Sequence, residues 1–237
     1  MLSGCCPVVE LRQYTLRPGQ REVLVELFDR ALVESQEAVG MQIVGQYRDL
    51  DRPDRFVWLR GFPGMEQRRA SLEAFYGGPV WREHAAAANA TMVDVDDVLL
   101  LRPAAPTSGF APLVAPRPDG DGADGNDGTD GVVLVTIGAL DAPASPANLA
   151  RLLPALAAMN APPLACFVEE TSENTFPALP VRAGEHVVVW LQRGDSDPRS
   201  QAEVLETSAK VGTAMLSELA APPTALRLQP TPRSKLR

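Results

Sequence analysis

Cysteine is scarce in this chain of 237 residues, which contains only Cys5, Cys6 and Cys166. Two of them are adjacent and the third is distant, so they cannot form a framework of several disulfides. No other cysteine or histidine stands near the adjacent pair at a metal-ligand spacing. We therefore expect no metal site and a reducing, cytoplasmic environment.

Long apolar runs are missing as well. None approaches the roughly 20 apolar residues that a transmembrane helix requires. Residues 2–5, with the sequence LSGC, look like a lipoprotein cleavage site. They lack the basic stretch and the apolar stretch of roughly 7–15 residues that secretion requires. We therefore expect no membrane partner.

Positive charge is in deficit. The chain has 22 Lys and Arg against 30 Asp and Glu, which gives a net charge of −8. Such a charge repels phosphate backbones, so nucleic acid is not expected as a partner. Its 45% hydrophobic and 22% charged residues are typical of a globular protein that can build an apolar core.

The common cofactor and nucleophile motifs are also absent. No G-x-G-x-x-G follows an expected strand, and neither G-x-x-x-x-G-K-[ST] nor G-x-S-x-G occurs. The first two motifs bind dinucleotides and nucleoside triphosphates, and the third presents a nucleophilic serine. The sequence therefore predicts a protein that uses no cofactor.

Residues 104–131 interrupt every periodic pattern. They are rich first in Pro and Ala and then in Asp and Gly, a composition typical of a linker. We therefore predict one domain over residues 1–103 and a second over residues 132–237.

The Asp/Gly tract could instead be a calcium loop that starts at Asp119. Asp121, Asp127 and Asp130 would then supply ligands. In that alignment Ala123 takes a ligand position, and no glycine takes the position of the sharp turn. Calcium loops of this kind depend on both positions, so a solvated tether is the favoured interpretation.

The first domain shows the pattern of a βαββαβ unit. Polar and apolar residues alternate with the period of two that marks strands, and apolar residues recur at helical spacing between them. The expected elements are a strand over residues 8–16, a helix that Gly40 ends, strands over residues 42–49 and 55–62, a helix from Met65 that is interrupted at residues 77–79, and a strand that ends at Arg102.

Three features of this unit are distinctive. The first strand carries E-L-R-x-Y-T-L-R-P-G from Glu10, a strand pair is centred on Gly45 and Trp58, and Trp81 follows Gly-Gly-Pro. Together they resemble the NIPSNAP family, which is similar to the wider dimeric α+β-barrel group. The resemblance covers residues 8–102 and implies that fold. Members of the wider group include oxygenases and isomerases, so the resemblance does not fix a reaction.

The second domain repeats the order of elements with different residues. The expected elements are a strand over residues 132–140, a helix that Ser145 caps, strands over residues 164–170 and 186–193, a helix that opens at Asp197, and a strand over residues 225–229. Pro154 should kink or shorten the first of these helices. We interpret the unit as a degenerate repeat, because its first strand lacks a set like Glu10, Arg12 and Tyr14.

A four-stranded sheet with both helices on one face leaves its other face bare, and that face must be covered. We therefore predict an α+β protein. Two tandem ferredoxin-like βαββαβ units would pack sheet to sheet within one chain, as a dimeric α+β-barrel-type body. Alternatively, each half pairs with its counterpart in a second chain, which leaves a homo-oligomer open.

The polar and aromatic residues that we expect to face a cavity between the two sheets are the site candidates. Period two places Glu10, Arg12 and Tyr14 on one face of the first strand, and Trp58 and Arg60 share a face of the third. Arg12 could bind a carboxylate or enolate while Tyr14 donates a hydrogen bond. Glu10 would orient Arg12. The alternative is a buried Glu10–Arg12 pair within an aromatic core.

The second strand allows two registers. Either Tyr47 and Asp49 or Gln46 and Arg48 face the cavity, because a shift by one residue exchanges the two faces of a strand. We include Tyr47 among the residues that contact the ligand.

His84 follows Trp81 by three residues, on the same side of the expected helix. The ordinary pKa of histidine, roughly 6.5, suits a general base. We therefore assign His84 a catalytic role near the cavity entrance and Trp81 a role in ligand binding. One alternative is a partly exposed histidine at a helix end. The other is an axial haem ligand, but no other feature of the motif indicates haem binding.

The sequence thus favours a protein that binds a small hydrophobic or aromatic organic ligand. The resemblance implies cofactor-independent oxygenation, isomerisation or cyclisation of an oxygenated, polyketide-like substrate. The alternative is a non-catalytic interaction or scaffold module. A closed cavity that holds Arg12, Tyr14 and Trp58 would favour the first hypothesis, and a filled core with an exposed apolar patch would favour the second.

We expect the Asp/Gly tract to bind no calcium at micromolar concentrations, because a ligand and the turn glycine are both missing from the loop pattern. Calorimetry at low salt measures this directly. Micromolar binding that disappears when Asp119 and Asp121 are changed to Ala would show the linker interpretation to be wrong.

Overall fold

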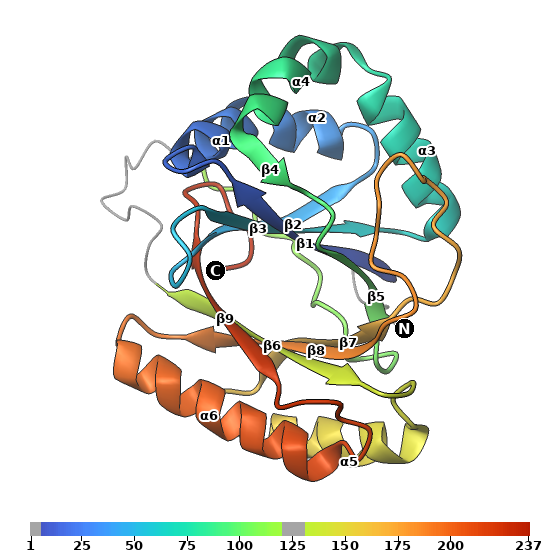
Figure 1. The fold of residues 1–237 in the computed structure, drawn as a ribbon, viewed down its shortest axis with the longest axis vertical. Coiled ribbons are helices and arrows are strands. Elements are labelled where there is room, and N and C mark those ends of the chain that lie inside the picture. Colours follow the sequence, from blue (N-terminus) through green and yellow to red (C-terminus); the bar gives the residue numbers. More distant parts are fainter. Residues whose placement is uncertain (1–5, 120–130) are drawn as a thin grey trace.

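The computed structural model describes residues 6–119 and 131–237 (Figure 1). The lipoprotein-like segment at residues 2–5 therefore lies outside the described residues. The same holds for the calcium-loop alternative, of which only Asp119 is described.

The first half contains the expected strands and helices and one additional short strand, Met92–Asp94. Its elements are β1 (Val8–Leu16), α1 (Arg21–Leu27), η1 (Phe28–Leu32), α2 (Val33–Glu37), β2 (Gln42–Asp49), β3 (Arg55–Phe62), α3 (Met65–Tyr76), α4 (Pro79–Thr91), β4 (Met92–Asp94) and β5 (Val98–Pro103). The helical stretch after β1 is continuous, but η1 at its centre is a π-helical turn. The predicted break in the second helix is confirmed, since Pro79 begins a new helix.

The second half also follows the expected order. Its elements are β6 (Val132–Leu140), α5 (Pro146–Ala157), β7 (Pro163–Glu169), β8 (His186–Gly194), α6 (Pro198–Met215) and β9 (Thr224–Pro230). The Ser145 hydroxyl accepts a hydrogen bond from the backbone N–H of Asn148 and so caps α5. This helix continues for three residues beyond Pro154.

Eight of these strands form a closed antiparallel barrel. Hydrogen-bonded neighbours follow the order β3, β2, β9, β6, β8, β7, β5 and β1, and β1 pairs with β3 to close the ring; β4 adds to β1. The two halves are joined by β2 with β9 and by β5 with β7. The sequence predicts two sheets packed face to face. The structure adds hydrogen bonds along both edges, which leave no free sheet edge in the ring.

The interior of the barrel is packed with apolar side chains from both halves. The buried cluster includes Val9, Leu11, Val44, Val57, Leu59, Val133, Val135, Phe167, Val189 and Leu191. These residues alternate along their strands with residues that face outward, as the pleat requires. The space between the two sheets is therefore lined by apolar side chains, and the polar residues of β1 that were predicted to face it do not.

The helices cover the outer faces of the barrel, with α1 to α4 on one side and α5 and α6 on the opposite side (Figure 1). On the first side, the outward residues of β1 and β3 form a second buried cluster with the helices, in which Tyr14, Phe28, Trp58 and Phe75 take part. The polar face of β1 thus points towards these helices.

Tyr47 faces the barrel interior, the space between the sheets where it was predicted, but it is thereby separated from Tyr14 and Trp58, which face the helices. Its hydroxyl donates a hydrogen bond of 3.1 Å to the backbone oxygen of Leu236. A Cβ at Gly45 would lie 2.0 Å from the Tyr47 hydroxyl oxygen, so the ring needs a glycine beneath it. Tyr47 therefore holds the C-terminal segment against β2.

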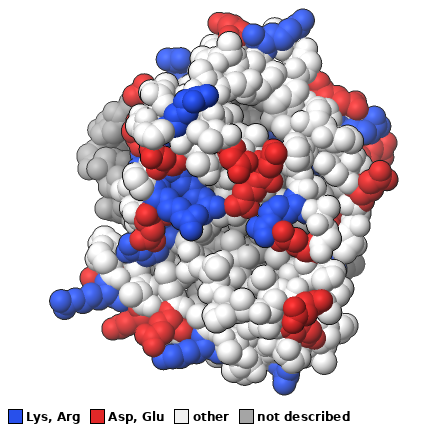
Figure 2. Space-filling view, in the orientation of Figure 1, with Lys and Arg blue, Asp and Glu red and all other residues white. Residues whose placement is uncertain are grey.

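The surface shows charges of both signs. On the face drawn in Figure 2, acidic and basic side chains lie next to one another rather than in one patch of a single sign. In the part of the chain that the structure describes, we find no helix with the length and apolar character to cross a membrane.

Cutting the chain within residues 120–130 should not separate the halves. Two strand pairs and a shared apolar core join them, and both would be exposed to water on separation. Size-exclusion chromatography after cleavage at an inserted protease site tests this. Elution of the N-terminal fragment alone, as a stable, soluble monomer, would contradict the closed barrel.

Candidate functional site

The candidate site begins on two neighbouring strands. In the antiparallel register of β1 and β3, Glu10 is paired with Arg60 and Arg12 with Trp58. Directly opposed residues of this kind have their side chains on the same face of the sheet. Strand pairing therefore brings together four residues from two distant parts of the sequence.

Glu10 accepts hydrogen bonds from three buried arginines. Its Oε2 atom lies 2.7 Å from Nη1 of Arg12 and 2.8 Å from Nε of Arg60, and its Oε1 atom lies 2.6 Å from Nε of Arg68. The side chains of all four residues are 0% exposed. One carboxylate thus connects β1, β3 and helix α3.

Arg68 is the functional residue that sequence reasoning missed, although a signal for it exists. It lies on α3 with Ser71, Leu72 and Phe75, all of them buried. These positions are three, four and seven residues further along the chain, the spacing of one helix face. An arginine on the buried face of a helix requires a partner, and the carboxylate of Glu10 in the strand motif was a candidate.

The arginines determine the charge of the site. Burial alone would raise the pKa of Glu10, but Arg60, Arg12 and Arg68 outweigh it and hold this pKa far below its usual range. Glu10 is therefore ionised, and three guanidinium groups surround one negative charge. Four buried donor atoms of this site have no hydrogen-bond partner among the described residues, namely Nη2 of Arg12, Arg60 and Arg68 and Nε1 of Trp58.

Arg12 also contacts Tyr14. Its Nε atom donates a hydrogen bond of 2.9 Å to the Tyr14 hydroxyl oxygen. Burial raises the pKa of Tyr14 more than the neighbouring guanidinium lowers it, so the phenol keeps its proton. Since the oxygen accepts from Arg12, the hydroxyl hydrogen is directed towards another group.

A small cavity lies between this face of the barrel and the helices. Its volume is about 30 Å³, enough for a water-sized molecule but not for a benzene ring, which occupies engineered cavities of roughly 150 Å³. It is lined by Tyr14, Leu24, Phe28, Leu32, Gln36, Trp58, Phe75, Tyr76, Trp81 and Met92. The arginines lie one side chain behind this wall, since Arg12 is bonded to Tyr14 and Arg60 to Gln36.

Aromatic rings form most of the cavity wall. The ring centroids of Phe28 and Trp58 are 4.9 Å apart, and those of Tyr76 and Trp81 are 5.0 Å apart. The π-helical turn η1 contributes both Phe28 and Leu32. A π turn widens a helix locally and is often found at functional sites. Such a wall suits a flat, apolar ligand.

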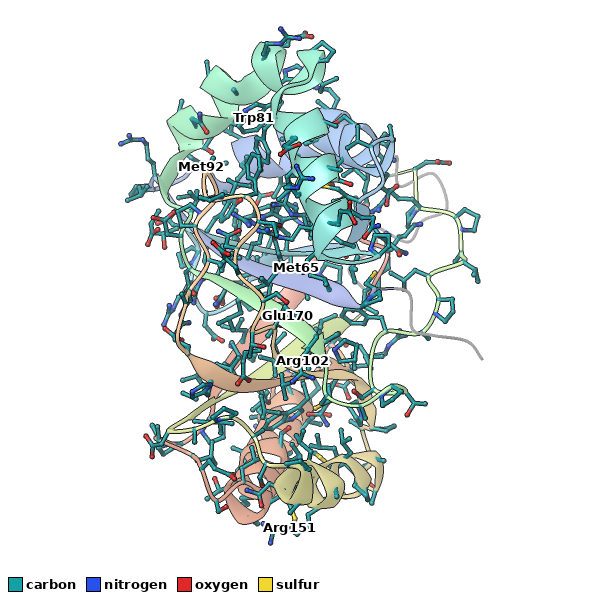
Figure 3. All side chains as sticks on the ribbon, turned by 90° about the vertical axis from the view of Figure 1, so that its right-hand side faces the viewer. Met65, Trp81, Met92, Arg102, Arg151 and Glu170 are labelled. Carbon is teal, nitrogen blue, oxygen red and sulfur yellow. The ribbon has the colours of Figure 1, made fainter. Side chains whose placement is uncertain are left out.

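A loop of the second half covers this region from outside. Residues 170–185, here called the strap, connect β7 to β8 and rise beside α3 (Figure 1). Figure 3 shows the strap running from Glu170 at the level of the sheets towards Met92 on the helix side. Phe176 of the strap stacks on Tyr76 at 5.8 Å. The second half thus takes part in closing the site.

Comparison with protein-family models gives a match in the first half of the chain. Residues 9–106 match the model of the NIPSNAP family. The first half of the chain is a NIPSNAP domain. No curated protein matches the sequence.

The solved structures that are similar to the chain include three with the following identity and coverage. An anthrone oxidase-like protein is 15% identical with a TM-score of 0.51, and the match covers 97% of this chain and 94% of that one. A "putative monooxygenase" from Lactobacillus acidophilus is 10% identical with a TM-score of 0.51, covering 95% and 94%. A NIPSNAP-like domain protein from Burkholderia xenovorans is 23% identical with a TM-score of 0.40, covering 44% and 90%. At these identities the first two comparisons show a shared fold across both halves.

Most of the predicted site residues of the NIPSNAP domain come together, although not between the sheets. Glu10, Arg12 and Arg60 form the charged cluster, while Tyr14, Trp58 and Trp81 line the cavity. Their predicted roles stay predictions. The location is corrected to the space between the sheet and the helices, because the polar face of β1 turns outward from the barrel.

The register of β2 is now fixed. Gln46 pairs with Trp58 and donates a hydrogen bond of 2.9 Å to Asp29 on η1. Arg48 binds Glu22 of α1. The residues on the helix side are therefore Gln46 and Arg48, and not Tyr47.

His84 does not line the cavity. It lies on α4 with its side chain 24% exposed, and its ring is 4.0 Å from the carboxylate of Glu83. The described residues contain no cluster of three or more His, Cys, Asp or Glu side chains arranged for a metal ion.

The second half provides an internal comparison. Its third strand, β8, carries Trp190 opposite Thr136, as β3 carries Trp58 opposite Arg12. Trp190 donates to Ser208, and Ser208 donates to Gln192. Among the described residues, no buried side-chain donor or acceptor of β6 to β9, α5 or α6 is left without a partner. The unpaired donors are thus concentrated in the NIPSNAP domain.

Changing Glu10 to Gln should destabilise the fold by about 3–5 kcal/mol, because three buried guanidinium groups would lose their only carboxylate. Glu22→Gln is the matched control, since Glu22 pairs with Arg48 at the surface and should cost at most about 1 kcal/mol. Chemical denaturation measures both values. Equal losses would mean that the buried cluster contributes no more than a surface pair.

Proposed function

We propose that the NIPSNAP domain binds a hydrophobic, oxygen-bearing aromatic compound in the cavity between β1, β3 and the helices. The observation that carries this proposal is the Arg12–Tyr14 pair at an aromatic wall. The Tyr14 phenol keeps its proton and can donate it in a hydrogen bond to a ligand oxygen. Arg12, behind it, strengthens that donor.

We infer that the chain is a fused pair of ferredoxin-like units that forms a dimeric α+β-barrel-type body by itself. In each half the strands follow the order fourth, first, third, second, which is β5, β1, β3, β2 and then β9, β6, β8, β7. The pairing of β2 with β9 and of β5 with β7 takes the place of contacts between two subunits. The chain therefore needs no second copy to cover its sheets, although a homo-oligomer of whole chains is compatible with this arrangement.

In its catalytic form, the proposal is a cofactor-independent oxidation of an aromatic ketone that has a ring CH2 group. Loss of a proton to solvent gives an enolate, whose oxygen would accept the hydrogen bond from Tyr14. The enolate carbon adds O2, and after protonation the hydroperoxide loses water to leave a second carbonyl. One O2 is consumed and one water is released. The names of the similar structures, anthrone oxidase-like and monooxygenase, support this reaction class.

The scaffold alternative has less support. Large exposed apolar residues in the described part of the chain, Val23, Leu50, Val93 and Val114, lie on four separate segments. A docking surface would need a contiguous patch. The unpaired buried donors in the NIPSNAP domain instead favour a site that a ligand completes.

Changing Tyr14 to Phe should weaken the binding of an aromatic alcohol such as 1-naphthol by about 1–1.5 kcal/mol, the usual contribution of one hydrogen bond. Titration calorimetry measures the affinity, and oxygen uptake with an anthrone measures the catalytic form.

Tyr47→Phe is the matched control, because it removes a buried hydroxyl from the barrel interior. It should lower the free energy of unfolding and leave the affinity unchanged. If Tyr14→Phe behaves in the same way as this control, Tyr14 is structural and the proposal is wrong.

A further inference from the structure

The charged cluster of the NIPSNAP domain carries more positive charge than Glu10 can neutralise. Arg12, Arg60 and Arg68 form ion pairs with this one carboxylate, and all four side chains are 0% exposed. Two positive charges are therefore in excess in a space shielded from water. A buried charge without a counter-charge is strongly destabilising, so an anion that enters this region would be stabilised there.

Donor atoms without partners show where such an anion can bind. Arg60 and Arg68 each have an unpaired Nη2 atom, and the indole N–H of Trp58 is also unpaired. The guanidinium carbon of Arg60 lies 4.9 Å from the centre of the Trp58 ring. A carboxylate has two oxygens and accepts about four hydrogen bonds, which matches this supply of donors.

The strap already places oxygen atoms at one of these arginines. Nη1 of Arg68 donates to Oδ1 of Asn174 at 3.0 Å and to Oγ1 of Thr175 at 3.4 Å. Both acceptors are neutral. Because the guanidinium is charged, a carboxylate oxygen in their place would add the attraction between two opposite charges, which a neutral oxygen lacks. The neutral oxygens of the strap thus occupy a position that an anionic oxygen would fill more favourably.

We propose that Arg68, with Arg60 and Trp58, binds the carboxylate of an aromatic acid, which replaces Asn174 and Thr175 of the strap. This inference rests on the proposed function, since the ring of the same molecule occupies the aromatic cavity. It narrows the ligand to a compound with two polar ends: an oxygen that faces Tyr14 and a carboxylate that faces Arg68.

Displacement of the strap also explains how a ring can enter. The cavity of about 30 Å³ must enlarge several-fold before it holds an aromatic ring. Phe176 follows directly after the two residues that contact Arg68, and it stacks on the Tyr76 ring of the cavity wall. Moving Asn174 and Thr175 away from Arg68 therefore moves Phe176 and frees Tyr76. Recognition of the carboxylate and opening of the cavity are one event.

The test compares 1-naphthoate with 1-naphthol by titration calorimetry on the full chain. The unmodified protein should bind naphthoate about tenfold or more tightly than naphthol. Arg68→Gln should abolish this preference, because naphthoate would lose its charge-assisted bond at Arg68. Arg69→Gln is the matched control, because Arg69 is an exposed neighbour paired with Glu73, and it should keep the preference.

A second variant tests the competition with the strap. Asn174→Ala removes an oxygen that competes for Arg68, so it should raise the affinity for naphthoate severalfold. A purely structural role of Asn174 would lower that affinity or leave it unchanged. This variant keeps Arg68 and its bond to Glu10, so it tests the inference even if Arg68→Gln does not fold.

Two outcomes separate this inference from the proposed function. If naphthol binds in a Tyr14-dependent manner while naphthoate binds no better, or if Arg68→Gln keeps the preference, the carboxylate site is wrong and the proposed function stands. If neither compound binds, both proposals are wrong.

Discussion

The carboxylate of Glu10 is the point on which the NIPSNAP domain depends. It binds guanidinium groups from β1, β3 and α3, so a single buried negative charge connects the sheet to the helix layer. Removing it would leave three buried cations without a counter-charge. The same arrangement holds Arg12 against Tyr14 and leaves donor atoms unpaired beside an aromatic wall. The stability of the domain and the chemistry of its site therefore come from one interaction.

The two halves of the chain perform different tasks within one barrel. Both place a tryptophan on their third strand, opposite the first strand. In the second half the indole and its polar neighbours satisfy one another, which gives a filled layer beneath α5 and α6. In the NIPSNAP domain the corresponding positions carry Arg12 and Arg60. Each of these arginines has an Nη2 atom without a hydrogen-bond acceptor among the described residues. The second half instead contributes the strap, whose Phe176 stacks on Tyr76 in the wall of a cavity that the second half does not line.

The sequence predicted the elements because each pattern is local. Alternation marks the strands, Pro79 restarts a helix, and the Asp/Gly tract separates two repeats of the same order. Period two also placed Glu10, Arg12 and Tyr14 on one face of β1, and they do share it. Arg68 could have been added from its position on the buried face of α3. These inferences needed only the geometry of one strand or one helix.

Only the tertiary structure decided which face of each strand lies inside the barrel and which face packs against the helices. Periodicity gives two faces of a strand but does not say which faces the barrel and which the helices, because both are buried and apolar residues occur on both. Packing put Tyr47 inside the barrel and Trp58 outside it. The contact between the strap and Arg68 joins residues that are 106 positions apart. The sequence by itself thus determined the elements and the motif, and only the closure of the barrel determined where the site lies.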